Sequence, residues 1–251
     1  MIRLIQITDT HIYAEAEYRF DGVNTRASFE RVLKHLHRFN PAYDGLLLTG
    51  DLAMDGSREA YEYLRHMLEE EVPVLCLPGN HDRPRYLAES GLSTAAPAPL
   101  SYVIADWHLI LLDTQVDDCA HGEIETAQID WLIRSLSAAR GDYAAVFLHH
   151  HPASIGSPWM DAMGLLSPDT LWSAIDAHPA VRLVAFGHVH QNLDWYRGRV
   201  RILAAPSTCV QFMPRATRYA ADARAPGYRI IDLGAAGQVT SSVVRVPMNV
   251  F

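Results

Sequence analysis

The stretch RLVAFGHVH, residues 182–190, joins a short apolar run to a glycine and two histidines. Successive side chains of a strand alternate in direction, so His188 and His190, two residues apart, point the same way. One such pair is not specific, because any two polar residues could occupy these positions facing water. Its significance depends on which residues follow the other apolar runs of the chain.

Four more apolar runs end in residues that can bind a metal. They are RLIQIT, followed by Asp9-Thr10-His11; GLLLT, followed by Gly50-Asp51; PVLCLP, followed by Gly79-Asn80-His81-Asp82; and AAVFL, followed by His149-His150-His151. The carboxyl ends of parallel strands lie along one edge of an α/β sheet, where sites are built. We therefore expect the five groups to converge. The glycines at 50, 79 and 187 are expected to let the backbone turn sharply there.

Amphipathic helices alternate with these runs, which predicts an α/β fold. RASFERVLKHLHRF (residues 26–39) and SREAYEYLRHML (57–68) carry apolar residues at helical spacing, and SPDTLWSAI begins another helix with Ser167 as its N-cap. After Gly187 the segments alternate with no helical pattern, so the C-terminal third is expected to be rich in antiparallel β-structure. No linker or repeat divides the chain, and residues 1–251 are predicted to form a single domain.

Composition excludes several classes of function. The formal net charge is −8, from 21 basic and 29 acidic residues, so no diffuse positive field exists to hold a nucleic-acid polymer. The first residues are too polar for a secretory signal, and no apolar run approaches membrane-spanning length. The three cysteines are scattered and odd in number, which suits a reducing compartment. The sequence thus predicts a soluble cytoplasmic protein whose partners include neither nucleic acid nor membrane.

The strand-end residues form a chemically complete metal-binding set. Taken singly, each motif is common by chance, and a histidine after a strand is usually a solvated loop residue. Together they supply two carboxylates, one amide and four imidazoles: Asp9, His11, Asp51, Asn80, His149, His188 and His190. These are too many ligands for one open ion and enough for two. Oxygen and imidazole ligands suit manganese, iron, cobalt or zinc.

Asp51 is the natural bridge between two metal ions, because it stands alone between the two histidine-bearing parts of the set. We assign one ion to Asp9, His11, Asp51 and His190, and the other to Asp51, Asn80, His149 and His188. Bridged ions lie ~3.5 to 4 Å apart, a separation that suits an in-line displacement. Two dications and two carboxylates leave about two positive charges, which favours a phosphate diester as substrate.

In their order along the chain, these motifs resemble the calcineurin-like metallophosphoesterase superfamily. The stretches GVNT, GDLAMDGSREAY, FLHHHP, GSPWMD, PSTCVQF and APGYR further resemble its bacterial class III cyclic-nucleotide phosphodiesterases, the 3',5'-cyclic AMP phosphodiesterase branch. The resemblance implies a sandwich of two mixed β-sheets flanked by helices, around a dinuclear centre that often holds iron with manganese. It also implies that His149 is the ligand among the three consecutive histidines. Family members are often oligomers, so a homo-oligomer is a further expectation.

The expected reaction is attack on phosphorus by a hydroxide held between the two ions. His81 follows the ligand Asn80 and cannot easily face the same ion, so we expect it to contact the phosphate and to protonate the leaving oxygen. Asp82 is expected to accept the second N–H of His81 and to hold its tautomer. Asn80 and His150 are the other predicted substrate contacts, although His150 is also consistent with packing under the site.

Two features have alternative interpretations. Trp159 in GSPWMD either stacks on a nucleobase or fills an edge of the core, and the arginines at 215, 218 and 224 belong either to a charged loop or to a lid. The leading hypothesis for function is hydrolysis of cyclic AMP to 5'-AMP. The alternatives are a broader phosphodiesterase, acting on 2',3'-cyclic nucleotides or glycerophosphodiesters, and a non-catalytic metal-binding protein. The presence of His81 argues against the last.

Overall fold

The computed structural model describes residues 1–40, 42–68, 71–95, 97–138 and 142–247. The helices are α1 (Thr25–Phe39), α2 (Arg58–Met67), α3 (Pro84–Ser90), α4 (Thr126–Ser137), α5 (Pro158–Asp161) and α6 (Pro168–Asp176). The strands are β1 (Ile2–Ile7), β2 (Arg19–Phe20), β3 (Val23–Asn24), β4 (Gly45–Thr49), β5 (Val74–Leu77), β6 (Leu100–Ile104), β7 (Trp107–Leu111), β8 (Tyr143–Leu148), β9 (Val181–Phe186), β10 (Leu193–Arg197), β11 (Val200–Ala204), β12 (Gln211–Phe212), β13 (Ala221–Asp222), β14 (Gly227–Leu233) and β15 (Val239–Arg245).

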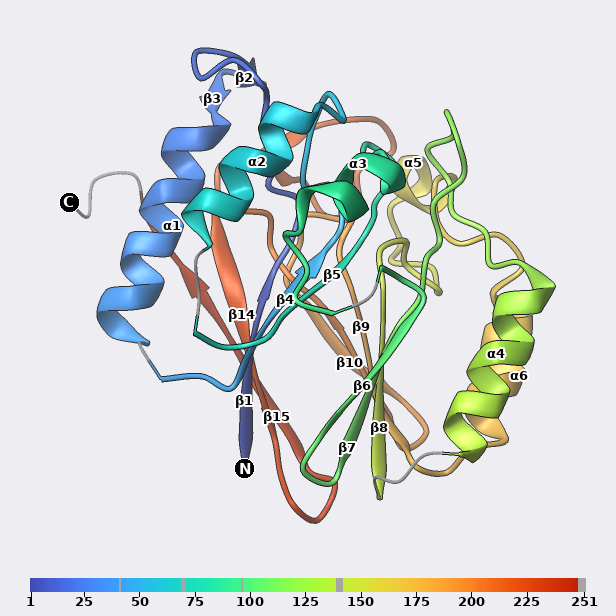
Figure 1. Ribbon diagram of the computed structural model, residues 1–251. Helices are drawn as coiled ribbons and strands as arrows, with labels where there is room; N and C mark the ends of the chain where they lie inside the picture. The colour runs from blue at the N-terminus through green and yellow to red at the C-terminus, as the bar shows by residue number, and fades with distance from the viewer. Residues whose placement is uncertain (41, 69–70, 96, 139–141, 248–251) are drawn as a thin grey trace.

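Two mixed sheets form the centre of the molecule (Figure 1). The first has the order β15-β14-β1-β4-β5, with β1, β4 and β5 parallel and the other pairs antiparallel. The second has the order β10-β11-β9-β8-β7-β6, in which the central pairs are parallel and the two outer pairs antiparallel. The predicted sandwich of two mixed sheets flanked by helices is confirmed.

Three apolar layers hold the elements together. Helices α1, α2 and α3 pack on the outer face of the first sheet, and α4 and α6 pack on the outer face of the second (Figure 1). The inner faces of the two sheets share a third layer, which includes the buried side chains of Leu4, Leu109, Phe147 and Leu183. Parallel strands covered on both faces are apolar throughout, and this explains the short unbroken runs in the sequence.

The helices predicted from residues 26–39 and 57–68 are present as α1 and α2. After α6, the described residues contain strands but no helix, as expected, although β11 pairs in parallel with β9. Ser167 precedes α6, but it adopts a left-handed backbone (φ 50°) and its side chain makes no capping hydrogen bond. Residues 248–251 of the predicted domain lie outside the described residues. No helix in the described ranges is both long and apolar enough to cross a membrane.

The side chain of Arg229 is buried between strands of the two sheets. The guanidinium of Arg229, in β14, donates to the carbonyl oxygens of Ala204 and Leu193. It also donates to the side-chain oxygens of Asn192 and Ser241. Arg229 therefore fastens the segment that follows the GHVH stretch to strands of both sheets.

Candidate metal centre

The five strand ends meet at one end of the sandwich, and they come from both sheets. Strands β1, β4 and β5 belong to the first sheet, and β8 and β9 to the second. Backbone hydrogen bonds join the ends within each sheet, from Asp9 N–H to Gly50 O (2.9 Å) and from Gly187 N–H to His149 O (3.2 Å). The His188 N–H crosses between the sheets to the Asp9 carboxylate at 3.1 Å. The predicted convergence is present, with the site spanning two facing edges.

The backbone at this end is strained. Five of the seven predicted ligands adopt the left-handed region: Asp9 (φ 53°), His11 (47°), Asp51 (51°), His188 (66°) and His190 (50°). Asp and His tolerate this region better than most residues, but each instance still costs about 1–3 kcal/mol. Such positions persist only where the surrounding structure enforces them, and they are typical of functional sites.

The glycines beside these ligands permit the strand ends to turn and to approach one another. Gly50 does adopt a positive φ, of 91°. Gly79 and Gly187 do not, but the chain turns at both as predicted: the Asp82 N–H donates to Gly79 O (3.2 Å) and the Val189 N–H to Gly187 O (2.7 Å). Both glycines are also required for space: a Cβ at Gly79 would lie 2.2 Å from Asp51 Oδ1, and one at Gly187 would lie 2.1 Å from Thr8 Oγ1. The missing side chains let the strand ends approach closely.

Asp9, His11 and His190 form one compact group of potential ligands, all buried. His190 Nε2 lies 3.3 Å from Asp9 Oδ1, and His11 Nε2 lies 3.1 Å from His190 Nε2. Lone pairs brought this close without a cation between them repel one another. The group therefore has the composition and spacing of three of the four ligands assigned to the first ion.

Asp51 lies between this group and the remaining histidines. Its Oδ2 is 3.7 Å from His11 Nε2 and 3.4 Å from His149 Nε2. On the far side, His188 Nδ1 lies 3.2 Å from His149 Nε2. Asp51 thus contacts ligands assigned to both ions, which is the position a bridging carboxylate needs.

The outward-facing nitrogens of three of the histidines are held by partners outside the cluster. His149 Nδ1–H donates to Thr49 O (2.9 Å), and His190 Nδ1–H donates to Val210 O (2.7 Å). His11 Nδ1 contacts the thioether sulfur of Met54 at 3.1 Å. Such contacts fix the ring and the tautomer, and they leave Nε2 free to bind a metal.

Burial and the charge of Asp51 determine the pKa values of three histidines in the cluster. Burial holds the pKa of His11 and His188 well below the ordinary value, so both stay neutral, the form that binds metals. Burial alone would also lower the pKa of His149, but the charge and hydrogen bond of Asp51 outweigh it and raise that pKa to about 9. Burial would raise the pKa of Asp51, yet the neighbouring histidines hold it well below its usual range. Metal binding here must displace a proton.

Several buried polar atoms near the cluster have no partner among the described residues. They include Asn80 Oδ1, His188 Nε2 and His150 Nε2. A buried polar atom without a partner costs about 1–3 kcal/mol, so an orphaned acceptor beside a carboxylate indicates a place for a cation. Cys209 is also close, but burial raises the pKa of its thiol to about 12, and it stays protonated. The oxygen and imidazole set therefore fits a pair of metal ions.

His150 is more central than expected. Its ring centre lies 4.8 Å from that of His188 and 4.9 Å from that of His149, and the three offer ligand atoms close enough to share an ion. Its Nδ1 pairs with the Thr114 hydroxyl at 2.8 Å. His150 does not line the cavity that reaches the cluster. The sequence interpretation treated it as a substrate contact or a packing residue, and the structure adds it to the potential ligands.

His81 lines the cavity and is only partly buried. Its backbone N–H donates to Asp51 Oδ1 (2.9 Å), and its ring centre lies 5.0 Å from that of His11. Its imidazole can also share a cation with His11 and Asp51. The ring is therefore close enough to the cluster to contact a phosphate bound there.

Asp82 has partners other than the predicted one. Its buried carboxylate accepts hydrogen bonds from the backbone N–H groups of Leu52, Ala53 and Gly79 and from the Tyr61 hydroxyl, at 2.9 to 3.1 Å. The expected hydrogen bond from His81 is absent from the described contacts, because these donors already occupy both oxygens. Burial and the nearby charge of Asp51 raise the pKa of Asp82 to about 6. Asp82 thus fastens the Asn80–His81 loop to the strand end that carries Asp51.

A cavity of about 270 Å³ opens onto the cluster. Six of the residues that line it are predicted site residues: His11, Asp51, Asn80, His81, His188 and His190. Four aromatic residues also line it: Phe20, Trp159, Phe212 and Tyr219. Apart from Trp159, these aromatic residues were missed, because they lie on short two-stranded hairpins that show no periodic signal.

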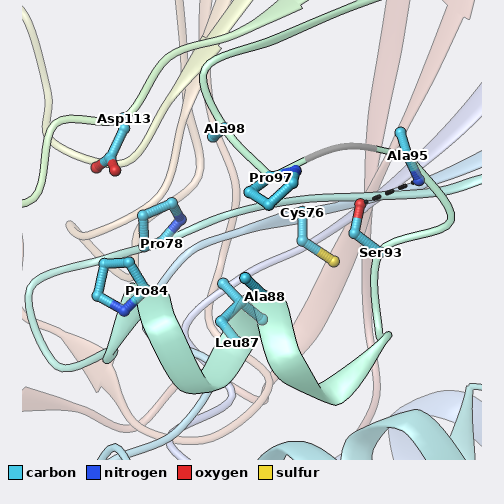
Figure 2. A pocket seen from close by; sticks show the side chains of 10 residues that line it. All are labelled: Cys76, Pro78, Pro84, Leu87, Ala88, Ser93, Ala95, Pro97, Ala98 and Asp113. Atoms are coloured by element: carbon cyan, nitrogen blue, oxygen red, sulfur yellow. Dashed lines mark hydrogen bonds between the residues drawn. The ribbon is translucent and has the colours of Figure 1, made fainter.

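A smaller cavity, of about 50 Å³, lies beside α3. Figure 2 shows Leu87 and Ala88 of α3 on one side of it, with Cys76 and Pro97 opposite. Its lining is mostly apolar, and its volume leaves room for only a few water molecules. It offers neither the ligands nor the room for a phosphodiester.

Comparisons with known proteins agree with this geometry. A family model described as calcineurin-like phosphoesterase matches residues 2–192. The chain is 38% identical to the 3',5'-cyclic adenosine monophosphate phosphodiesterase CpdA of Escherichia coli K12, across 98% of this chain and 90% of that protein. It is 37% identical to a 3',5'-cyclic-nucleotide phosphodiesterase of Nostoc sp., across 99% and 94%.

Solved structures share the fold at low sequence identity. A purple acid phosphatase, PPD1, from yellow lupin seeds superposes with a TM-score of 0.66 at 14% identity, over 97% of this chain and 53% of that one. A dimetal phosphatase from Danio rerio superposes with a TM-score of 0.62 at 14% identity, over 98% and 99%. The two-sheet sandwich described above is therefore common to all three chains.

Proposed function

The chain belongs to the calcineurin-like phosphoesterase family. We propose that it hydrolyses 3',5'-cyclic nucleotides, with cyclic AMP as substrate and 5'-AMP as product. The observation that supports the proposal is the convergence of oxygen and imidazole side chains that could bind metal, beside a cavity that His81 also lines. The relatives named for this reaction match almost the whole chain, including the cavity walls outside the family match.

We propose that Asp9, His11, Asp51 and His190 hold one metal ion and that Asp51, Asn80, His149 and His188 hold the other. Ions in such a pair supply an activated water as nucleophile and neutralise charge on the phosphate. The ligand chemistry suits manganese, iron, cobalt or zinc, and the family resemblance favours iron or manganese. His150 is proposed either as an additional metal ligand or as a contact of the substrate phosphate. Its Nε2 atom, which has no partner among the described residues, would make that contact.

His81 is proposed to protonate the leaving oxygen. A ribose alkoxide is a poor leaving group, so its departure requires a proton from a group within hydrogen-bonding reach. His81 meets this condition, because its backbone is fastened to Asp51 and its ring faces the cavity. Asp82 acts as a positioning residue, since its four donors set the conformation of the loop. Asn80 is the other substrate contact on this loop.

The remaining expectations are proposed with the function. Residues 1–251 act as one catalytic domain, because the inner faces of both sheets share a single apolar layer. The protein is proposed to work in the cytoplasm, where its three free cysteines stay reduced and where cyclic nucleotides are produced.

A substrate panel on manganese- or iron-loaded protein, with products identified by chromatography, tests the proposal. We expect cyclic AMP to be converted to 5'-AMP faster than 2',3'-cyclic AMP or glycerophosphodiesters are cleaved. The matched control is the same protein stripped of metal, which should be inactive. Faster cleavage of 2',3'-cyclic nucleotides or glycerophosphodiesters would replace the proposal with a broader phosphodiesterase. Bound metal without any turnover would indicate a non-catalytic protein.

A further inference from the structure

Four aromatic rings line part of the cavity, and we call them the aromatic wall: Phe20, Trp159, Phe212 and Tyr219. They come from three separate segments, namely β2, α5 and the β12–β13 hairpin. Residues this far apart in sequence form a common surface only through the tertiary fold. The cavity volume of about 270 Å³ is close to the lower end of the ~300 to 1,000 Å³ that is typical of small-ligand sites.

The aromatic wall is continuous with the candidate metal centre. The Phe212 ring stacks on the predicted ligand His190, with centroids 3.9 Å apart and an interplanar angle of 8°. The Phe20 ring lies 5.1 Å from that of His11. Trp159 packs edge-to-face on Phe212 at 5.2 Å and on Tyr219 at 5.7 Å. A ligand whose phosphate is held by the centre therefore places its other end against these rings.

Hydrogen bonds hold the aromatic wall in place before any ligand binds. Tyr219 donates its hydroxyl to Asp21 at 3.0 Å, which joins the β12–β13 hairpin to the turn after Phe20. Ser157 donates to Ala216 O at 2.9 Å, which joins the start of α5 to the same hairpin. A wall that is ordered in advance loses little conformational entropy when it binds a rigid ring.

Core packing accounts for part of this arrangement but not all of it, since Phe212 is buried in the core of the second sheet and Phe20 and Trp159 pack against that core. Tyr219 is 46% exposed, although burying its ring would be favourable. The indole Nε1 of Trp159 is shielded from solvent and has no acceptor among the described residues. An exposed apolar surface next to a polar centre is typical of a ligand site. Aromatic rings bind flat heterocycles by stacking, with little dependence on which base is present.

We infer that the aromatic wall is the subsite for the base of the nucleotide, with Trp159 as its principal ring. The inference rests on the proposed function, because it assumes a ligand whose phosphate lies at the metal centre. It excludes glycerophosphodiesters as preferred ligands, since they carry no ring to place against Trp159. It gives Trp159 a contact with the base in addition to its packing against the core of the second sheet.

Binding of two phosphomonoesters that differ only by the base tests the inference. The probes are 5'-AMP and ribose 5-phosphate, titrated by calorimetry into the manganese-loaded protein. Stacking is worth roughly 5- to 150-fold in affinity, so 5'-AMP should bind more tightly than ribose 5-phosphate by a factor in that range. Trp159→Leu should reduce the factor to about one and leave ribose 5-phosphate binding unchanged. Trp159→Phe should restore most of it.

Tyr219→Leu is the second variant, because its partly exposed side chain can be replaced with less risk to folding. It should lower the same factor by a smaller amount. Tyr196→Leu is the matched control, since Tyr196 is an exposed aromatic residue on the edge strand β10 and should keep the wild-type factor. A wild-type factor retained in both Trp159→Leu and Tyr219→Leu would overturn the inference.

Turnover of cyclic AMP by the wild-type protein separates this inference from the proposed function. If the wild-type protein hydrolyses cyclic AMP but Trp159→Leu does not change the ratio of 5'-AMP to ribose 5-phosphate affinity, the subsite is refuted and the proposed function is not. A base-dependent factor that falls in Trp159→Leu, in a protein that does not hydrolyse cyclic AMP, supports the subsite and refutes the proposed function.

Discussion

Between the two sheets, Leu109, Phe147 and Leu183 are fully buried in a layer of apolar side chains. A few residues further along the same strands, His149 and His188 are buried almost as completely, but among carboxylates and imidazoles. The interior has relaxed strand geometry, whereas the strand ends hold five non-glycine residues at positive φ. The same sheets thus provide stability along their length and store strain at their carboxyl ends.

The difference indicates which region carries function. Burial of apolar surface stabilises the fold by about 25 cal/mol per Å², and the interior layer provides that stabilisation. Unsatisfied polar atoms and left-handed residues each oppose folding by about 1–3 kcal/mol, so the strand ends are supported by the rest of the molecule. We therefore expect substitutions at the strand ends to change chemistry, and substitutions between the sheets to change stability.

The largest effect is expected at the bridge. Asp51→Ala removes the carboxylate that lies between the two ligand groups. Because losing even an outer partner of a metal ligand costs ~10- to 100-fold in metal affinity, loss of this ligand should weaken binding by more than about 100-fold and abolish activity. Elemental analysis after dialysis measures the metal content. Asp118→Ala, which removes an exposed carboxylate, is the control, and an active Asp51→Ala protein with two ions would refute the bridge.

A smaller effect is expected at His81. His81→Ala should keep both ions but lose about 10²- to 10⁴-fold in kcat with cyclic AMP, since the ribose oxygen then leaves without its proton. The p-nitrophenolate leaving group of bis(p-nitrophenyl) phosphate needs no proton, so the kcat of His81→Ala on this substrate should fall by less than about tenfold. Equal losses on both substrates would argue against acid catalysis. Loss of metal would instead make His81 a ligand.

The interior should respond in the opposite way. Leu109→Ala leaves a cavity between the sheets and should lower the free energy of unfolding by about 2–5 kcal/mol. Urea unfolding measures the change. Metal content of the folded protein should stay at the wild-type value, because no strand end moves. Val103→Ala on the neighbouring strand, where the side chain is half exposed, should cost under about 0.5 kcal/mol. A loss of metal in Leu109→Ala would mean that the two regions are not separable.

The smallest effect concerns Asp113, which follows β7 and lies at the rim of the small cavity (Figure 2). Burial raises the pKa of Asp113 to about 6, so the folded state favours the neutral acid. The stability it contributes is present below the unfolded pKa of about 4 and is lost as the pH rises through about 6. Asp113→Asn should therefore stabilise the protein by about 1–2 kcal/mol at neutral pH, with no gain below about pH 4.

Urea unfolding of Asp113→Asn at both pH values measures this effect. The substitution keeps an oxygen that can accept the Gln115 N–H, so the local turn is preserved. Asp118→Asn is the exposed control and should show no such pH dependence. An equal gain at both pH values would contradict burial of the charge as the cause.

The predicted ligands could be found from sequence because each lies directly after an apolar run. Asp9, Asp51 and His188 were identified in this way, and the fold brings all of them to one end of the sandwich. The partners of Asp82 could not be found, since its carboxylate is adjacent to His81 in sequence but bonded to Leu52 and Tyr61 in space. A residue next to Asp82 in sequence cannot donate a hydrogen bond to it when donors from other segments already occupy both carboxylate oxygens.

The amino-acid sequence by itself determined which donor atoms are present and that they end strands, because ligand chemistry belongs to single side chains and strand signals are local. The tertiary structure alone decided that both sheets share the site, which nitrogen of each histidine faces inward, and that Phe20 and Tyr219 line the same cavity. These features depend on contacts between segments as distant as Asp9 and Ser207, and no local pattern encodes them.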